Sequence, residues 1–449
     1  MFSFKKKDKE NEVKNVNENQ EEIKSKKKMK PLKKGLIITG CSVVAIVAAL
    51  GITVGALWGN ELSSVCSIKK ITEANYDIKA GPVYEMNVSG GYYFDKFIEE
   101  GGASNDTELI NFIVDNITKG IIPISMKAPT IGCSSFTCVT EDGDRLFGRN
   151  YDFTQTTSMI VHTNPGGNRY SSISSVDLQF LGITEGKEID GLLNTLITLA
   201  APYAPLDGVN EKGVSCGIYM SYQGDRIQDE GEEYHYEVVA TNQDTDKPDI
   251  TSTTMLRMVL DYADSVESAV EMIKKYDLHD SASTSFHYMI ADASGKSAIL
   301  EWVEQDGRSN DDKDGSTREL KVYYNDDDAV LGSKEDENEF QYITNFILTP
   351  DYYENEEFRK DEQGKDRYDE IEKMINPDGT NAKGVVKDEA EALKILQTVG
   401  RRNWDKVNGE TDGNGCTVWS ALYNLTDKTV TWVGNEQFDN PNACFAFSL

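Results

Sequence analysis

The sequence predicts an α+β domain preceded by a basic tail and one transmembrane helix. Pairs of short apolar runs separated by a turn, typical of β-hairpins, occur at residues 133–153, 286–303 and 416–434. Apolar residues at helical spacing predict helices within 92–119 and over 251–276. Hairpins therefore dominate, with helices interspersed among them, which indicates the α+β class.

Residues 1–34 and 35–59 differ from the rest of the chain. The first stretch has 12 lysines against six acidic residues, a composition typical of disorder. The second has no charge, and as a helix it would span roughly 37 Å, enough to cross a bilayer core of ~30 Å. The lysines place the tail in the cytoplasm. We therefore expect a single-pass protein of the cell membrane with an extracytoplasmic domain; a signal peptide cleaved near Ala56 is the alternative.

The composition of the chain disfavours some classes of function. The chain has 449 residues, 39% of them hydrophobic, enough for a large core in addition to the tail. A net charge of −30 disfavours nucleic acid as a partner. The seven cysteines are odd in number and scattered, and they predict neither a disulfide framework nor a zinc site.

The stretch from Gly132 to Phe153 brings a thiol, a cation and a carboxylate together. A hairpin around an Asp-Gly turn would place Arg149 and Asp152 alongside Cys133. A nearby guanidinium favours the reactive thiolate. Because 149 and 152 differ by an odd number, both side chains can reach the thiol only if the strand bulges or ends near 150–151, and we expect such a bulge.

This stretch lacks a conventional base, since none of the four histidines lies in a Cys/His signature. If the bond between Gly132 and Cys133 is cut, the new α-amine of Cys133, with a pKa near ~8, can act as the base. Asp152 could hold that amine. A structural hairpin with a buried, inert cysteine is the alternative.

These residues resemble the opening of a known family. Cys133, Arg149 in Phe-Gly-Arg-Asn and Asp152 are similar to the choloylglycine hydrolase and penicillin V acylase family, N-terminal-nucleophile cysteine amidases related to acid ceramidase and N-acylethanolamine amidase. The intervals of 16 and 19 residues after the cysteine match those of the family. The resemblance extends to about residue 435. It implies a four-layer αββα sandwich of two antiparallel sheets, with a catalytic domain at 133–449.

The resemblance also implies further site residues. Asn345, after Thr344, matches the asparagine whose amide stabilises the oxyanion, a contribution of roughly 3 kcal/mol; a buried turn residue is the alternative. Arg367 opens a helix and resembles an arginine near the nucleophile; a surface salt bridge is the alternative. The string at 207–213 leads into a strand whose family position next to the nucleophile falls near Tyr219 or Met220. His287 on the 286–303 hairpin is expected to be a satisfied core residue.

The implied activity is hydrolysis of a linear, non-peptide amide bond in a small N-acyl substrate, without metal or cofactor. Cys133 would attack the carbonyl, Asp152 orient the amine, Arg149 support the thiolate and Asn345 hold the oxyanion. Residues 60–132 are expected to be a pro-segment retained as a light chain. Acyl transfer through the same thioester, and an uncut surface binding protein with the same fold, are the alternatives. A homo-oligomer is compatible with the sequence, and the amide substrate is left open.

Overall fold

The computed structural model describes residues 58–120, 132–183, 186–227, 235–304, 315–326, 339–350, 352–353, 363–402 and 415–449. The chain divides into two units, 1–62 and 63–449. The predicted tail, and all but the last two residues of the predicted anchor, lie outside the described ranges and stay predictions. None of the helices within those ranges combines the length and apolar character that a membrane crossing requires.

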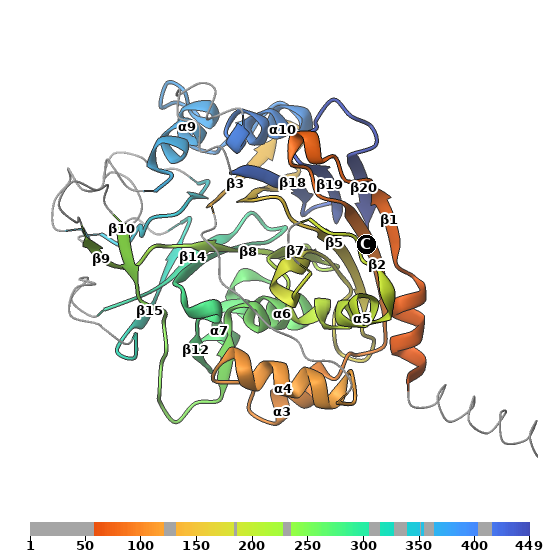
Figure 1. Ribbon diagram of the computed structural model, residues 1–449. Helices are drawn as coiled ribbons and strands as arrows, with labels where there is room; N and C mark the ends of the chain where they lie inside the picture. Colours follow the sequence, from red (N-terminus) through yellow and green to blue (C-terminus); the bar gives the residue numbers. More distant parts are fainter. Residues whose placement is uncertain are drawn as a thin grey trace, which may run out of the picture. The chain divides into compact units, whose positions relative to one another are not determined.

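The larger unit contains a nine-stranded and a seven-stranded sheet (Figure 1). The nine-stranded sheet runs, in spatial order, β1 (Lys69–Thr72), β2 (Val83–Ser89), β5 (Ser158–Asn164), β6 (Ser172–Asp177), β7 (Asp207–Asn210), β8 (Ser215–Met220), β13 (Phe286–Ala291), β14 (Ser297–Val303) and β15 (Glu319–Tyr324). The seven-stranded sheet runs β16 (Tyr342–Ile343), β3 (Gly132–Thr140), β4 (Arg145–Phe153), β18 (Cys416–Asn424), β19 (Thr429–Gly434) and β20 (Cys444–Ser448), with β17 (Val385–Val386) also paired to β3.

Most strand pairs are antiparallel, and the three predicted hairpins are β3–β4, β13–β14 and β18–β19. Within the two large sheets, two pairs are parallel: β2 with β5 and β17 with β3. The predicted antiparallel pairing of the two sheets is therefore confirmed except at these two places. At the first, the strand comes from the segment that precedes Cys133, and the long connection between β2 and β5 allows the parallel pairing.

Helices lie on the far sides of the two sheets. In Figure 1, α9 and α10 lie above β3 and β18, while α3 to α6 lie below β7 and β8. Helix α10 packs against β4 and β18, α9 against β3, and α6 against β7 and β8, and the two sheets meet where β3 contacts β8. The helices are α3 (Phe94–Glu99), α4 (Asp106–Asn116), α5 (Gly191–Ile197), α6 (Ser252–Tyr262), α7 (Val266–Ile273), α9 (Lys365–Ile375) and α10 (Glu389–Thr398). The predicted α+β class is confirmed.

The described part also contains short elements. They are the strands β9 (Gly224–Ile227), β10 (His235–Val238), β11 (Asp249–Thr251) and β12 (Asp277–His279), and the 3₁₀ helices η1 (Tyr76–Ile78), η2 (Leu178–Leu181), η3 (Thr198–Tyr203) and η4 (Ser281–Ser283). Helices α6 and α7, predicted as one stretch with a break at 264–265, each begin with a capping box, from Thr251 and Ser265 respectively.

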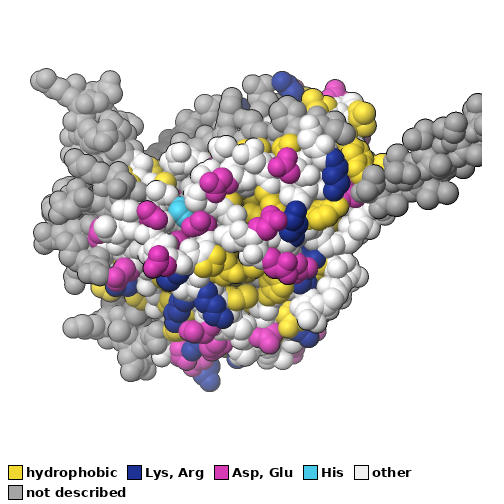
Figure 2. All heavy atoms as spheres, turned by 90° about the horizontal axis from the view of Figure 1, so that it is seen from below, with side chains coloured by type: hydrophobic (Ala, Val, Ile, Leu, Met, Phe, Trp, Pro, Cys, Tyr) yellow, Lys and Arg dark blue, Asp and Glu magenta, His cyan; other side chains and the backbone are white. Residues whose placement is uncertain are grey.

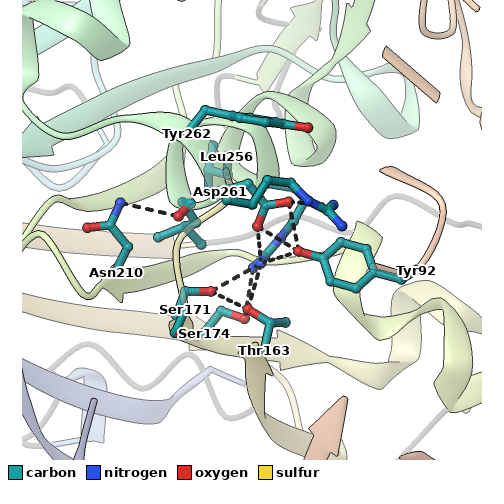
Figure 3. Close-up of polar contacts among 12 residues, drawn as sticks. Tyr92, Thr163, Ser171, Ser174, Asn210, Leu256, Asp261 and Tyr262 are labelled. Atoms are coloured by element: carbon teal, nitrogen blue, oxygen red, sulfur yellow. Dashed lines mark hydrogen bonds and ion pairs between the residues drawn. The ribbon is translucent and has the colours of Figure 1, made fainter. Parts of the chain in front are cut away.

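The segment before Cys133 is part of the core. Figure 3 shows Tyr92 pointing into a buried polar cluster, where its hydroxyl donates to Asp261 of α6 over 2.6 Å. Arg257 lies 3.1 Å from the same carboxylate and 3.2 Å from Thr163 of β5. Burial raises the pKa of the Tyr92 hydroxyl, so that it stays a donor. This segment therefore joins β5 and α6 through contacts that water does not reach.

The face in Figure 2 carries mixed charge. Acidic and basic side chains are interspersed there around a band of hydrophobic ones. Such a face lacks the clusters of lysines and arginines that bind phosphate backbones.

The exposed hydrophobic residues of the described part include Leu192 and Leu193 of α5, which are 75% and 52% exposed.

Candidate active site

The β3–β4 hairpin forms as the sequence predicts. Its turn lies at 141–144, where Gly143 has a φ of 96°, a left-handed conformation that favours glycine. In the register, Cys133 pairs with Tyr151 and Gly132 pairs with Asp152. The thiol and the carboxylate thus belong to neighbouring positions at one end of the hairpin.

The bulge expected in β4 is absent, and that prediction is wrong. Strand β4 pairs with β3 without a break, so Arg149 and Asp152 project from opposite faces. An irregularity does occur, but in β18, where Val418 is inserted opposite the step from Tyr151 to Asp152. No bulge is needed in β4, because Asp152 pairs with Gly132 and its carboxylate contacts Arg367 and Thr417.

On the inner face, Arg149 lies beside the thiol. Its Nη2 donates to the carbonyl of Ile218 over 2.7 Å, and the same carbonyl lies 3.8 Å from the Sγ of Cys133. Its Nη1 has no hydrogen-bond partner among the residues that the structure describes. Burial raises the pKa of the Cys133 thiol to about 11, against the opposing effect of the guanidinium. With its peptide bond to Gly132 intact, Cys133 is therefore a neutral thiol at pH 7.

A buried carboxylate holds Arg149 in place. Asp207, fully buried at the start of β7, lies 3.4 Å from the Nε of Arg149. It also accepts hydrogen bonds from Trp419 Nε1, over 2.9 Å, and from the Tyr423 hydroxyl. The ring of Tyr219 packs 4.3 Å from the guanidinium. No role in the site was predicted for Asp207 from the sequence, and the signal that could have identified it is its position at the start of the 207–213 string.

The side chain of Asn345 contacts the backbone of the nucleophile. Its Oδ1 accepts a hydrogen bond from the Cys133 nitrogen over 2.8 Å, and its Nδ2 donates to the Met220 carbonyl over 2.9 Å. Asn345 follows β16, which pairs with β3. His287, fully buried, lies 3.0 Å from both the Thr344 carbonyl and Glu301, so it is the satisfied core residue that was predicted.

Arg367 links Asn345 to Asp152. Arg367, at the start of α9, is 2% exposed, forms an ion pair with Asp152, and donates to Asn345 Oδ1 over 3.3 Å. The surface salt-bridge alternative for Arg367 is therefore wrong. Thr417 donates to the second Asp152 oxygen over 2.6 Å, a contact that the sequence did not indicate. The Cys133 nitrogen thus faces a connected set of charged and amide groups.

Two further groups lie close to this set. Glu436 accepts hydrogen bonds from the backbone nitrogens of Arg402 and Thr417, over 2.9 and 3.3 Å. Burial, and next the charge of Asp152, raise the pKa of Glu436 to about 7. Tyr222, with a left-handed φ of 49°, has its pKa raised by burial and by the neighbouring Cys133. Neither residue was singled out from the sequence, because neither belongs to a local motif.

A thiol beside a guanidinium, with its backbone nitrogen hydrogen-bonded to a side chain, is an arrangement in which a cysteine can act as a nucleophile. Residues 133–308 match the model of the family described as linear amide C–N hydrolases, choloylglycine hydrolase family. The resemblance to this family predicted from the sequence is thus confirmed over residues 133–308.

The individual proteins to which the chain is similar share a low sequence identity with it. The chain is 26% identical over 184 residues to a bile salt hydrolase/transferase of Clostridium perfringens, an alignment that covers 38% of this chain. It spans about half, 49%, of the length of that relative. Among solved structures, a variant of the conjugated bile acid hydrolase from Clostridium perfringens has a TM-score of 0.42 at 18% identity, covering 70% of this chain and 92% of that one. Penicillin V acylase from Agrobacterium tumefaciens has a TM-score of 0.37 at 15% identity, with 67% and 83% covered.

Proposed function

We propose that the protein hydrolyses linear, non-peptide amide C–N bonds in N-acyl substrates, with Cys133 as an N-terminal nucleophile. One observation carries the proposal. The Cys133 nitrogen donates to Asn345, which is bonded to Arg367, which pairs with Asp152. The N–H group of an ordinary peptide bond needs no such set of charged neighbours. An α-amine at the same place could be positioned by them and could take the thiol proton.

The amine would arise by self-cleavage. The Cys133 thiol attacks the Gly132 carbonyl, the C–N bond between the two residues breaks, and water then releases Gly132 as a carboxylate. The close packing supports this site: a Cβ built on Gly132 would lie 3.1 Å from the Cβ of Asp152 and 3.3 Å from its Oδ2. A residue with a Cβ would fit there only if the carboxylate that is to hold the new amine shifted by a few tenths of an ångström.

The same groups would then act on the substrate. The α-amine takes the thiol proton, Sγ forms a bond to the acyl carbon, and the carbonyl electrons move onto the oxygen. The Nδ2 of Asn345 stabilises that oxyanion, and Arg149 supports the thiolate. The leaving amine takes the proton as the C–N bond breaks, and a thioester remains. Water, activated by the α-amine, releases the acyl group as a carboxylate.

We further propose that the architecture is the αββα sandwich of N-terminal-nucleophile hydrolases and that residues 60–132 stay bound after cleavage. Strand β2 supports retention, since it lies inside the nine-stranded sheet between β1 and β5. Phe94 and Phe97 of α3 are fully buried. Separating the segment would expose these side chains and the β5 edge to water.

We also propose that residues 35–59 anchor the protein in the cell membrane, with the basic tail in the cytoplasm. The uncharged run of 25 residues and the lysines before it support the anchor. Protease added outside intact cells should then remove the catalytic domain and leave the tail. A domain protected until the cells are lysed would contradict this orientation.

The activity is tested by incubating the purified protein with N-acyl amides and measuring the amine released. Conjugated bile acids, penicillin V and N-acylethanolamines form the starting panel, since the names of the similar proteins refer to them. We expect hydrolysis of at least one, and none by Cys133→Ala. An amine acceptor is also added, and formation of a new amide from it would show acyl transfer. A cleaved protein that releases no amine from any N-acyl compound would contradict the proposal.

A further inference from the structure

A histidine and a carboxylate form a buried pair close to Asn345. His287 of β13 and Glu301 of β14 lie on neighbouring strands and are both fully buried, with Nδ1 and Oε1 3.0 Å apart. The ring of Tyr219, the partner of His287 in β8, packs edge-on against the imidazole, with the ring centroids 5.9 Å apart. Contacts with three strands of the nine-stranded sheet therefore fix the imidazole.

Each polar atom of the pair faces a partner of a fixed kind. Glu301 accepts hydrogen bonds from two backbone nitrogens over 2.8 Å, Leu348 at Oε1 and Thr349 at Oε2. An ionised Glu301 thus accepts on both oxygens, and Nδ1 of His287 donates to it. Nε2 lies 3.0 Å from the carbonyl oxygen of Thr344, which can only accept. The ring therefore satisfies both partners as an imidazolium, with a hydrogen on each nitrogen.

These contacts hold the chain on both sides of Asn345. The carbonyl of Thr344 belongs to the peptide unit that leads into Asn345, and it is bonded to His287. The two nitrogens that donate to Glu301 follow shortly after Asn345 in the chain. Strand β16, which precedes it, has only two residues, so its pairing with β3 fixes little of this segment. The buried pair supplies the support that the short strand lacks.

We infer that His287 and Glu301 are positioning residues, which hold Asn345 with its Oδ1 at the Cys133 nitrogen and its Nδ2 ready for the oxyanion. The inference rests on the proposed amide hydrolysis. A donor lowers the barrier most when it is already aimed at the developing charge, because turning it during the reaction costs free energy. Neither member of the pair would touch a reacting atom, so each would change kcat through Asn345 alone.

The first test is a double-mutant cycle between His287→Gln and Asn345→Ala, with rates measured per cleaved molecule. Glutamine has a single amide nitrogen and cannot place a donor at both Glu301 and Thr344. We expect His287→Gln to lower kcat at least tenfold and to leave KM within threefold, because the residue does not bind the substrate. In the Asn345→Ala protein, the same change should lower kcat less than threefold.

Two further variants accompany the cycle. Tyr288→Phe is the matched control, since Tyr288 is the next residue of β13 and its hydroxyl donates to Asp280 over 3.0 Å. It should leave kcat within a factor of three. Glu301→Gln should repeat the pattern of His287→Gln, because an amide group cannot accept both backbone hydrogen bonds. The melting temperature of each variant reports whether the fold is kept.

The second test needs no substrate. In the uncut Cys133→Ala protein, the backbone amide at position 133 still faces Asn345, and its hydrogen exchange reports on that contact. Adding His287→Gln to this protein should speed exchange at position 133 at least tenfold. The amide of Val139, which donates to the Gly384 carbonyl over 3.0 Å, lies further along β3 and should exchange at an unchanged rate.

The outcomes separate this inference from the proposed function. If His287→Gln lowers kcat equally with and without Asn345, or in neither case, the positioning role is wrong while the activity stands. If no N-acyl amide is hydrolysed, the proposed function fails, and hydrogen exchange alone decides on the pair. Faster exchange at position 133 would then support the positioning role, and unchanged exchange would overturn it.

Discussion

The Oδ1 of Asn345 accepts a hydrogen bond from the backbone nitrogen of Cys133 over 2.8 Å, although 212 positions separate the two residues. This contact ties the proposed oxyanion donor to the atom that would become the catalytic amine. The Nδ2 group of Asn345 has two hydrogens, and it donates one of them to the Met220 carbonyl. Among the described residues the other hydrogen has no acceptor, so it could bind an oxyanion.

Replacing Asn345 with alanine should lower kcat by about 10²–10³-fold, the usual effect of removing one oxyanion donor. The rate is measured per cleaved molecule, because the same variant should also slow self-cleavage. Asn194→Ala is the control, since Asn194 lies on the exposed side of α5 and bonds only to Asp190. A cleaved Asn345→Ala protein with kcat within a factor of three of wild type would remove Asn345 from the mechanism.

Replacing Asp207 with asparagine should raise the pKa of the Cys133 thiol. Asp207 fixes Arg149, and the guanidinium lowers that pKa. We expect alkylation of Cys133, followed by peptide mass spectrometry across pH, to move to higher pH, and kcat/KM to fall at least ~10-fold, the effect of losing about 1.4 kcal/mol.

The control for Asp207→Asn is Asp261→Asn. Asp261 and Arg257 form another fully buried pair, 3.1 Å apart. Breaking either pair should destabilise the fold by about 3–5 kcal/mol. Only the Asp207 variant should change the thiol titration. Equal thiol pKa values in the two variants would show that Asp207 acts on stability alone.

Replacing Gly132 with alanine should slow self-cleavage at least ~10-fold, because the added methyl would have to displace Asp152. The uncut fraction is followed over time by denaturing electrophoresis. Gly59→Ala is the matched control, since a Cβ there would meet no atom within 4 Å. Cleavage of Gly132→Ala at the wild-type rate would indicate that Asp152 takes no part in the step.

Glu436 should make the stability depend on pH. Its pKa is raised from 4.5 to about 7, so the folded protein binds this proton more tightly than the unfolded chain. The resulting stabilisation is complete below pH 4.5 and is lost as the pH rises to about 7, a change of up to about 3 kcal/mol. Urea unfolding across this range should show a slope that Glu436→Gln, which mimics the protonated form, lacks.

The control for Glu436 is Glu267→Gln on the exposed face of α7. It should retain the wild-type slope between pH 4.5 and 7. A Glu436→Gln protein whose stability follows the wild-type pH curve would assign that slope to another group.

The local parts of this site could be predicted from the sequence. The Asp142-Gly143 turn and its flanking apolar runs predict the β3–β4 hairpin, because hairpin formation depends on neighbouring residues. The position of Asn345 followed from the resemblance to a family and from no local pattern. The odd spacing of 149 and 152 predicted a bulge wrongly, because we assumed that both side chains approach the same atom of Cys133.

The contacts that fix the site could not be predicted. Asp207 lies 58 positions from Arg149 and on the other sheet, and Thr417 lies 265 positions from Asp152. The packing of the two sheets creates the first pair, and the order of strands within one sheet creates the second. Periodicity within one segment carries no information about which strand will lie beside it.

The central claim is that Cys133 becomes an N-terminal residue, and intact-mass analysis of the purified protein with N-terminal sequencing tests it most directly. We predict two chains, one beginning at Cys133 and one ending at Gly132, that elute together under native conditions. Cys133→Ala should give one uncut chain without activity. A protein that hydrolyses amides while the bond between Gly132 and Cys133 remains intact would contradict the account.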